Sequence, residues 1–306
     1  GVASGTTMQG GTTTVFAGAS ATDTTVNGGE LDLVEGSIVS GTTVNTGGLV
    51  SVSGTLSTAA VAGGEVDVFS GGVVSAASVT DGGNVFVEDG GSAVSATVGE
   101  AGYLEVDSGG TATATQVGSA GILDLTDGAV ASGTTLTNSG TLYTGSGATA
   151  VGTVVEDGGS LQLQQGGAAS GTTMQGGTTT VFAGASATDT TVNGGELDLV
   201  EGSIVSGTTV NTGGLVSVSG TLSTAAVAGG EVDVFSGGVV SAASVTDGGN
   251  VFVEDGGSAV SATVGEAGYL EVDSGGTATA TQVGSAGILD LTDGAVASGT
   301  ALTNSG

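Results

Sequence analysis

The sequence has 306 residues, of which 64 are glycine, and it contains no lysine, arginine, histidine, cysteine or proline. Its 30 acidic residues give a formal net charge of −30 at pH 7, and without a basic residue the chain is a poor partner for nucleic acid or anionic membrane surfaces. The missing residue types also exclude Ser/His/Asp and Cys/His catalytic arrangements and zinc sites.

The sequence shows neither a targeting signal nor a membrane span. Gly1-Val2-Ala3-Ser4 lacks the basic region of a signal peptide, and no apolar run approaches the roughly 20 residues needed to span a bilayer. We therefore expect a fragment or a mature segment whose signal and anchor lie elsewhere. Hydrophobic residues make up 38% of the sequence and are placed periodically, which favours a packed core over disorder.

One short motif recurs from end to end, and 63–71, read as GGEVDVFSG, shows it clearly. Two glycines followed by a variable residue and then apolar, polar, apolar predict a short strand with one buried face between two turns. Glycine pairs such as Gly28-Gly29 and Gly63-Gly64 are expected at sharp corners with positive φ. The same strand is predicted at Leu31-Asp32-Leu33, Val50-Ser51-Val52, Leu104-Glu105-Val106, Leu123-Asp124-Leu125 and Leu161-Gln162-Leu163.

A second predicted strand precedes each glycine pair and ends on an apolar residue. Strand alternation also directs the residue two positions earlier inward, and the residue five positions earlier is expected to form an inner corner. The apolar column is Met8, Val26, Val44, Val61, Val79, Val98, Val117, Leu136 and Val155. The inward residues before it are Thr6, Thr24, Thr42, Ala59, Ala77, Ala96, Thr115, Thr134 and Thr153. The expected corner residues are Ala3, Ala21, Val39, Leu56, Val74, Ala93, Ala112, Ala131 and Ala150.

These columns divide the sequence into rungs of mostly 18–19 residues within a larger repeat. Ser4–Gly140 recurs as Ser170–Gly306 with one difference, Thr135 becoming Ala301. We predict an all-β fold, a parallel β-helix or β-solenoid, as a single continuous domain over 1–306. Residues 1–166 form the first nine-rung repeat and 167–306 a second, truncated copy, with no cap visible at the C-terminal end.

The rung consensus G-x-A-x-x-T-T-V-x-x-G-G-x-L-x-V-x-x-G resembles the repeat of AIDA-type autotransporter adhesin passengers. Residues 91–109 show it, with Ala101 replacing one glycine. The resemblance covers essentially the whole chain. It implies a right-handed parallel β-helix, secreted to the bacterial cell surface and anchored in the Gram-negative outer membrane through a domain outside this chain. It also implies adhesion to a host receptor or glycan, or self-association that leads to autoaggregation and biofilm.

In that family, repeat Ser and Thr residues can carry heptose added by a cytoplasmic heptosyltransferase. The residue just before the apolar column should point outward, but Ala60, Gln116 and Val154 interrupt this series. High strand propensity explains the same threonines equally well. The resulting glycosylation candidates are Thr7, Thr25, Thr43, Ser78, Thr97, Thr135, Thr173, Thr191, Thr209, Ser244 and Thr263.

Only carboxylate chemistry remains available, and we expect a non-enzyme without catalytic residues or cofactors. The alternative is a carbohydrate-active β-helix that uses Glu105 and Asp124 on neighbouring rungs, since two carboxylates suffice for glycoside hydrolysis. A denser acidic patch could bind Ca²⁺ or serve only as a solvated face of an acidic spacer. Its members are Glu88, Asp89, Glu105, Asp107, Asp124 and Asp127, and the second copy holds Glu254, Asp255, Glu271, Asp273, Asp290 and Asp293. The calcium candidates among them are Glu88, Glu105, Asp107, Asp124 and Asp127.

Overall fold

The computed structural model describes residues 1–292 and 294–303. Its 50 strands are joined by turns, and no helix occurs among the described residues. No described segment is therefore a helix long and apolar enough to cross a membrane. Two compact units are present, the first made of Gly1–Thr153 with Gly158–Ser160 and the second of Val154–Asp157 with the chain from Leu161 onward.

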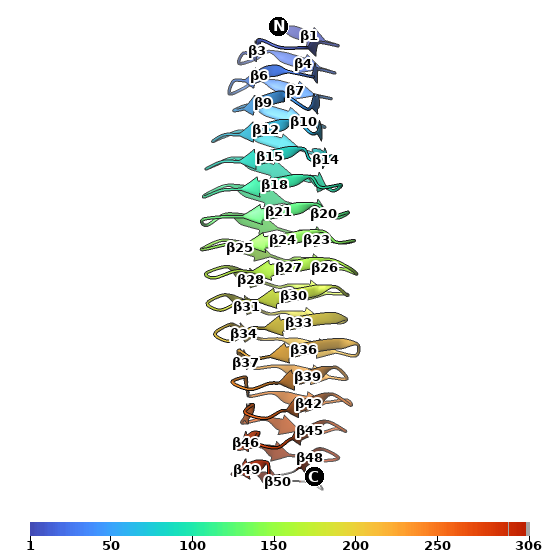
Figure 1. The fold of residues 1–306 in the computed structure, drawn as a ribbon, viewed down its shortest axis with the longest axis vertical. Coiled ribbons are helices and arrows are strands. Elements are labelled where there is room, and N and C mark those ends of the chain that lie inside the picture. Colours follow the sequence, from blue (N-terminus) through green and yellow to red (C-terminus); the bar gives the residue numbers. More distant parts are fainter. Residues whose placement is uncertain (293, 304–306) are drawn as a thin grey trace. The chain divides into compact units, whose positions relative to one another are not determined.

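Each turn of the chain contributes one strand to each of three parallel sheets, called here sheets A, B and C in chain order. Within each unit, successive strands of one sheet stack directly above one another (Figure 1). Ala21, for example, is in register with Ala3 and Val39, and Val26 is in register with Met8 and Val44. The protein is thus an all-β parallel solenoid, as its periodicity predicts.

In the first unit, sheet A consists of three-residue strands. They are β1 (Val2–Ser4), β4 (Ser20–Thr22), β7 (Ile38–Ser40), β10 (Thr55–Ser57), β13 (Val73–Ser75), β16 (Ser92–Val94), β19 (Thr111–Thr113), β22 (Val130–Ser132) and β25 (Thr149–Val151). Sheet B consists of β2 (Thr7–Met8), β5 (Thr25–Val26), β8 (Thr43–Asn45), β11 (Ala60–Ala62), β14 (Ser78–Thr80), β17 (Thr97–Val98), β20 (Gln116–Val117) and β23 (Thr135–Leu136). Sheet C has the longest strands, β3 (Thr12–Val15), β6 (Gly29–Leu33), β9 (Gly48–Val52), β12 (Glu65–Val68), β15 (Asn84–Val87), β18 (Tyr103–Val106), β21 (Ile122–Leu125) and β24 (Thr141–Thr144).

The second unit repeats this arrangement. Its sheet A contains β28 (Ala168–Ser170), β31 (Ser186–Thr188), β34 (Ile204–Ser206), β37 (Thr221–Ser223), β40 (Val239–Ser241), β43 (Ser258–Val260), β46 (Thr277–Thr279) and β49 (Val296–Ser298). Its sheet B contains β26 (Val154–Val155), β29 (Thr173–Met174), β32 (Thr191–Val192), β35 (Thr209–Asn211), β38 (Ala226–Ala228), β41 (Ser244–Thr246), β44 (Thr263–Val264), β47 (Gln282–Val283) and β50 (Ala301–Leu302). Its sheet C contains β30 (Thr178–Val181), β33 (Gly195–Leu199), β36 (Gly214–Val218), β39 (Glu231–Val234), β42 (Asn250–Val253), β45 (Tyr269–Val272) and β48 (Ile288–Leu291). β27 (Ser160–Leu163) is also a strand of sheet C, and its first residue belongs to the first unit and the rest to the second.

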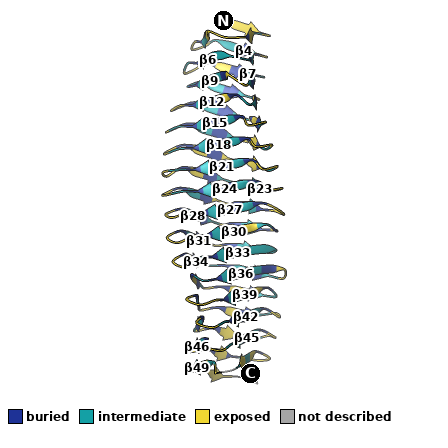
Figure 2. Cartoon of the chain, viewed as in Figure 1, coloured by how far each residue is buried: buried dark blue, intermediate teal, exposed yellow. Residues whose placement is uncertain are grey.

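The core of each unit is a narrow column of small and branched aliphatic side chains. In one turn, Val39 of sheet A, Val44 of sheet B and Val50 and Val52 of sheet C all point inward and are fully buried. Figure 2 shows the same division, with buried residues along the strands and exposed residues at the turns. Because every side chain of this core meets the turns above and below it, burial depends on stacking, as in other repeat proteins.

Two details of the predicted rung are wrong. The residues expected to form an inner corner, such as Val39, lie in the middle of the sheet A strands, so a rung has three strands and not two. The corner lies two residues later, between sheets A and B, where the backbone adopts a positive φ at Gly41. Alanine and other non-glycine residues also occupy this corner, for example Ala76 with φ 51° and Ala114 with φ 54°.

The glycine pairs lie at corners. In Gly28-Gly29 the second glycine has both φ +81° and a close approach to the carbonyl oxygen of Gly11, but in Gly63-Gly64 the two glycines have different roles. Gly63 has φ +72°, which a side chain would strain. Gly64 does not share this conformation. A Cβ atom added to Gly64 would lie 2.6 Å from Cγ1 of Val44 and 2.7 Å from the carbonyl oxygen of Asn45. The second glycine is therefore required because the backbone of the preceding turn approaches it closely.

Candidate functional site

The outer face of sheet B carries the predicted glycosylation candidates. All eleven side chains lie next to a buried residue in a sheet B strand, and none of them is buried. Thr7, Ser78, Thr97, Ser244 and Thr263 are exposed, and the other six are half-buried. The structure thus gives each candidate hydroxyl the outward orientation expected from strand alternation. Their modification stays a prediction.

Sheet A carries a second series of outward hydroxyl groups that sequence reasoning missed. The last residue of almost every sheet A strand is Ser or Thr, as in Ser40, Ser57 and Ser75, which are in register with one another. The sequence analysis places the residue before each of them at a corner and predicts no strand there, so it does not predict that these hydroxyl groups point outward. Its sequence signal is the recurrence of Ser or Thr one residue after the expected corner column.

The outer face of sheet C gathers acidic and aromatic residues. Asp67 is in register with Ser51 and Phe86, and Glu105 is in register with Phe86 and Asp124. The ring of Phe86 meets that of Tyr103 edge to face, with centroids 6.2 Å apart. The second unit repeats this contact between Phe252 and Tyr269.

A tyrosine joins the two carboxylates that sequence analysis singled out as a possible catalytic pair. Tyr103 Oη lies 2.8 Å from Glu105 Oε2 and 3.1 Å from Asp124 Oδ2, and its one proton donates to either. Burial and the hydrogen bond to Glu105 raise the pKa of the Tyr103 hydroxyl above its usual range. Tyr269 makes the same contacts with Glu271 and Asp290. The tyrosine thus provides a donor that offsets part of the repulsion between stacked acids.

Burial also raises the pKa of a carboxyl group on this face, that of Asp67. Desolvation, followed by the negative charges of Glu65, Glu88 and Glu30, raises the pKa of Asp67 to about 6. The equivalent residue of the second unit, Asp233, has a pKa raised to about 6 by desolvation and by its own acidic neighbours. Each unit therefore contains a carboxyl group that takes up a proton under mildly acidic conditions.

The calcium candidates lie on this face and its adjoining turns. Glu88, Glu105, Asp107 and Asp124 are half-buried and Asp127 is exposed. Among the described residues, no three acidic side chains are arranged to hold a metal ion, and Asp107 accepts a hydrogen bond from Thr126 in the next turn. Of the equivalent residues in the second copy, Asp293 lies outside the described residues. Calcium binding by this patch stays a prediction.

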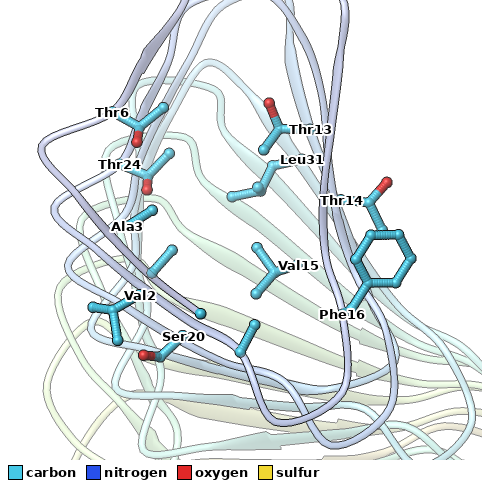
Figure 3. Close-up of a pocket in the computed structure, with 13 residues that line it drawn as sticks. Val2, Ala3, Thr6, Thr13, Thr14, Val15, Phe16, Ser20, Thr24 and Leu31 are labelled. Atoms are coloured by element: carbon cyan, nitrogen blue, oxygen red, sulfur yellow. The ribbon is translucent and has the colours of Figure 1, made fainter.

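Four pockets among the described residues are lined by other side chains. One lies at the first turn, where Ala3, Thr6, Thr13, Val15 and Leu31 surround the uncovered core (Figure 3). Ala3 and Thr6, which are predicted to face inward, are exposed and half-buried respectively, whereas Ala21 and Thr24 at the same positions of the next turn are buried. Another pocket is formed in the same way around the last described turn of the second unit, and two more lie at glycine corners. Glu105 and Asp124 line none of these four.

Among known proteins, a solved structure supports the solenoid fold. No family model matches the chain, and neither does any curated protein. Among solved structures, the chain is similar to the TibC-catalysed hyper-glycosylated TibA fragment 55–350. The two share 28% sequence identity with a TM-score of 0.63, over 97% of this chain and 99% of that one.

Two other structures also align over most of the chain. The fluoroquinolone-resistance protein QnrB1 aligns at 10% identity and a TM-score of 0.20, covering 81% of this chain and 83% of its own. PfbA, a surface adhesin of Streptococcus pneumoniae, aligns at 6% identity and a TM-score of 0.23, covering 92% and 83%.

Proposed function

We propose that this chain is part of a bacterial surface adhesin, an extracellular β-helical passenger segment that mediates adhesion or self-association and is glycosylated on Ser and Thr. The observation that carries this proposal is the similarity to the hyper-glycosylated TibA fragment along nearly the whole of both chains. The repeat resemblance to AIDA-type passengers agrees with it. In this proposal, residues 1–306 form one continuous solenoid, and an outer-membrane anchor lies outside the chain.

The activity is tested by displaying the chain on the surface of cells that do not otherwise aggregate. Cells that carry it should settle faster than cells that carry only the anchor, or bind better to a host-cell layer. Equal settling together with equal binding would refute both adhesion and self-association and leave the alternatives of an acidic spacer and a carbohydrate-active enzyme. Reducing-sugar release from a panel of glycans, measured in parallel, tests the alternative of a carbohydrate-active enzyme, for which we expect no activity.

Glycosylation is tested separately by peptide mass spectrometry of the native protein from cells with an active glycosyltransferase. We expect heptose-sized additions on the exposed residues Thr97 and Thr263, which occupy equivalent places in β17 and β44. The peptide containing Ala301 provides an internal control, because it lacks the hydroxyl that Thr135 supplies in the first copy. Unmodified peptides throughout would reduce these threonines to strand formers. Additions on sheet A serines alone would move the acceptor column to that sheet.

A further inference from the structure

The acidic residues are distributed unevenly over the three faces. Among the described residues, no strand of sheet A or sheet B contains an acidic residue. The charges lie in sheet C strands, such as β6, β12 and β18, and in the turns. A chain with a net charge of −30 therefore has two sheets whose outer faces are uncharged in both units.

Of these two faces, sheet A is the more apolar. It bears large side chains in mid-sheet, with Ile38 exposed to 59% in the first unit and Ile204 to 58% in the second, and Val130 and Val151 are also exposed. Sheet B exposes no large hydrophobic residue except Leu302 in its last described strand. Ile38 lies in register between Ser20 and Thr55, so these apolar side chains are spaced among hydroxyl groups and do not form a continuous patch. What distinguishes sheet A from sheet B is that it exposes several large apolar side chains on an uncharged face.

The rest of sheet A is a repeating array of small hydroxyl groups. Ser and Thr of neighbouring turns already bond across this face, as between Thr111 and Ser92 at 3.2 Å and between Ser132 and Thr113 at 3.4 Å. Each hydroxyl both donates and accepts, so such a face is complementary to a copy of itself without any opposite charge. The parallel register also repeats this face at the spacing of one strand, roughly 4.8 Å.

The charge distribution decides which face another copy of the chain could use. A copy that approached sheet C would bring acids against acids with no cation on either molecule, and like charges in contact repel. Sheet A is uncharged and exposes both apolar side chains and self-complementary hydroxyl groups, so two copies can meet on it without opposing charges. We propose that the outer face of sheet A is the surface through which two copies of this chain associate side by side. This inference rests on the self-association in the proposed function and names the face responsible.

The test compares equal charges placed on different faces of the full chain. The variant Ser75→Asp/Ser241→Asp adds one carboxylate to sheet A of each unit. The matched control Asn84→Asp/Asn250→Asp adds the same charge to sheet C, and all four positions are half-buried. Circular dichroism confirms that both variants are folded. Sedimentation velocity over a concentration series should show association weakened at least tenfold by the sheet A variant and much less by the control.

A second pair of variants removes apolar surface without adding charge. Ile38→Ser/Ile204→Ser should also weaken association, whereas Phe69→Ser/Phe235→Ser, which removes residues exposed to 41% beside sheet C, should not. This pair decides the question if the aspartate variant fails to fold. A wild-type chain that stays monomeric at every concentration would refute self-association itself. Wild-type association that sheet A and sheet C variants weaken equally would instead refute the choice of face.

Discussion

Glycine at a corner of this solenoid serves one of two physical purposes, and Gly82 and Gly83 show both. Gly82 has φ +73° and open space around the position of a Cβ atom, whereas a Cβ on Gly83 would lie 2.3 Å from the carbonyl oxygen of Val61. The next turn shows that the first position accepts a side chain, since Ala101 occupies it with φ 61°. Strain in the left-handed region is thus tolerated, and collision with the preceding turn is not.

We expect Gly82→Ala to destabilise the protein by about 1 kcal/mol, the usual cost of a Cβ in the left-handed region. Gly83→Ala should cost at least about 3 kcal/mol, because the backbone of two turns must separate to admit the methyl group. Denaturant unfolding of the two variants, compared at equal slope, measures the difference. Equal losses would show that close approach of the backbone is not what the second glycine provides.

Asp67 links stability to pH because it is easier to protonate in the folded chain. Its pKa is about 6 when folded and about 3.9 when unfolded, so the folded state binds the extra proton between these values. Stability should therefore be greatest near pH 4 and fall as the pH rises to about 6. Asp67→Asn/Asp233→Asn should remove most of this decline and be more stable than wild type at pH 7.

Thermal unfolding at half-unit steps between pH 4 and 7 checks this prediction. Asp81→Asn/Asp247→Asn is a suitable control, because it removes the same number of charges from exposed turn residues. A control variant with the same pH profile as Asp67→Asn/Asp233→Asn would mean that total charge, and not the environment of Asp67, determines the effect.

Several inward threonines have hydroxyl groups with no hydrogen-bond partner in the described part of the chain. Thr134 is fully buried, and its Oγ1 accepts or donates no hydrogen bond among these residues. A buried hydroxyl without a partner costs about 1–3 kcal/mol, and valine has nearly the same shape. Thr134→Val should therefore stabilise the chain by about 1 kcal/mol, measured as a higher denaturant midpoint. Loss of stability would indicate that the hydroxyl is hydrogen-bonded in solution.

At the scale of the strand, the sequence predicts sheets B and C well and sheet A poorly. Leu31-Asp32-Leu33 alternates over a whole strand, so β6 and its counterparts were predicted with the correct inward face. Sheet A strands contain three residues with a single inward side chain, often alanine as in Ala93, which is too short for alternation to be recognised. The pairing register of neighbouring strands then follows from the repeat, because residues at equivalent positions of successive rungs pair once the rungs are known to stack.

Contacts between successive turns were predictable only in part. The register of Glu105 with Asp124 follows from the repeat and is confirmed. The position of the Tyr103 hydroxyl between those carboxylates depends on rotamers, which no sequence pattern specifies. Hydroxyl columns could likewise be predicted as outward, but which column is modified depends on an enzyme outside the chain.

The single difference between the two copies tests how much the outer side of sheet B contributes to folding. Thr135 is half-buried in β23 beside the fully buried Leu136. Thr135→Ala reproduces the residue found at position 301, and an outward strand threonine should contribute less than about 1 kcal/mol through strand propensity. Chemical denaturation of the unglycosylated chain measures the change. A loss above about 2 kcal/mol would give this hydroxyl a structural role.

At the scale of the whole molecule, the composition makes charge the main barrier to association. Thirty acids without one basic residue repel every approaching copy, and the effect is strongest at low ionic strength because the Debye length grows to about 30 Å at 0.01 M salt. The uncharged sheet A face lowers this barrier in one direction but does not remove it. Association should therefore respond to both salt and pH.

We expect light scattering by the folded chain to rise as the pH falls from 7 toward the sequence pI of about 4.1. Asp67 and Asp233 should contribute to the first part of the rise, because their raised pKa values of about 6 place their protonation earliest. Screening should act in the same direction, so that 0.5 M NaCl at pH 7 increases scattering over 0.01 M NaCl. Circular dichroism at each pH separates association from unfolding. Scattering that stays flat from pH 7 to 4, with the fold intact, would show that charge repulsion does not control the meeting of these chains.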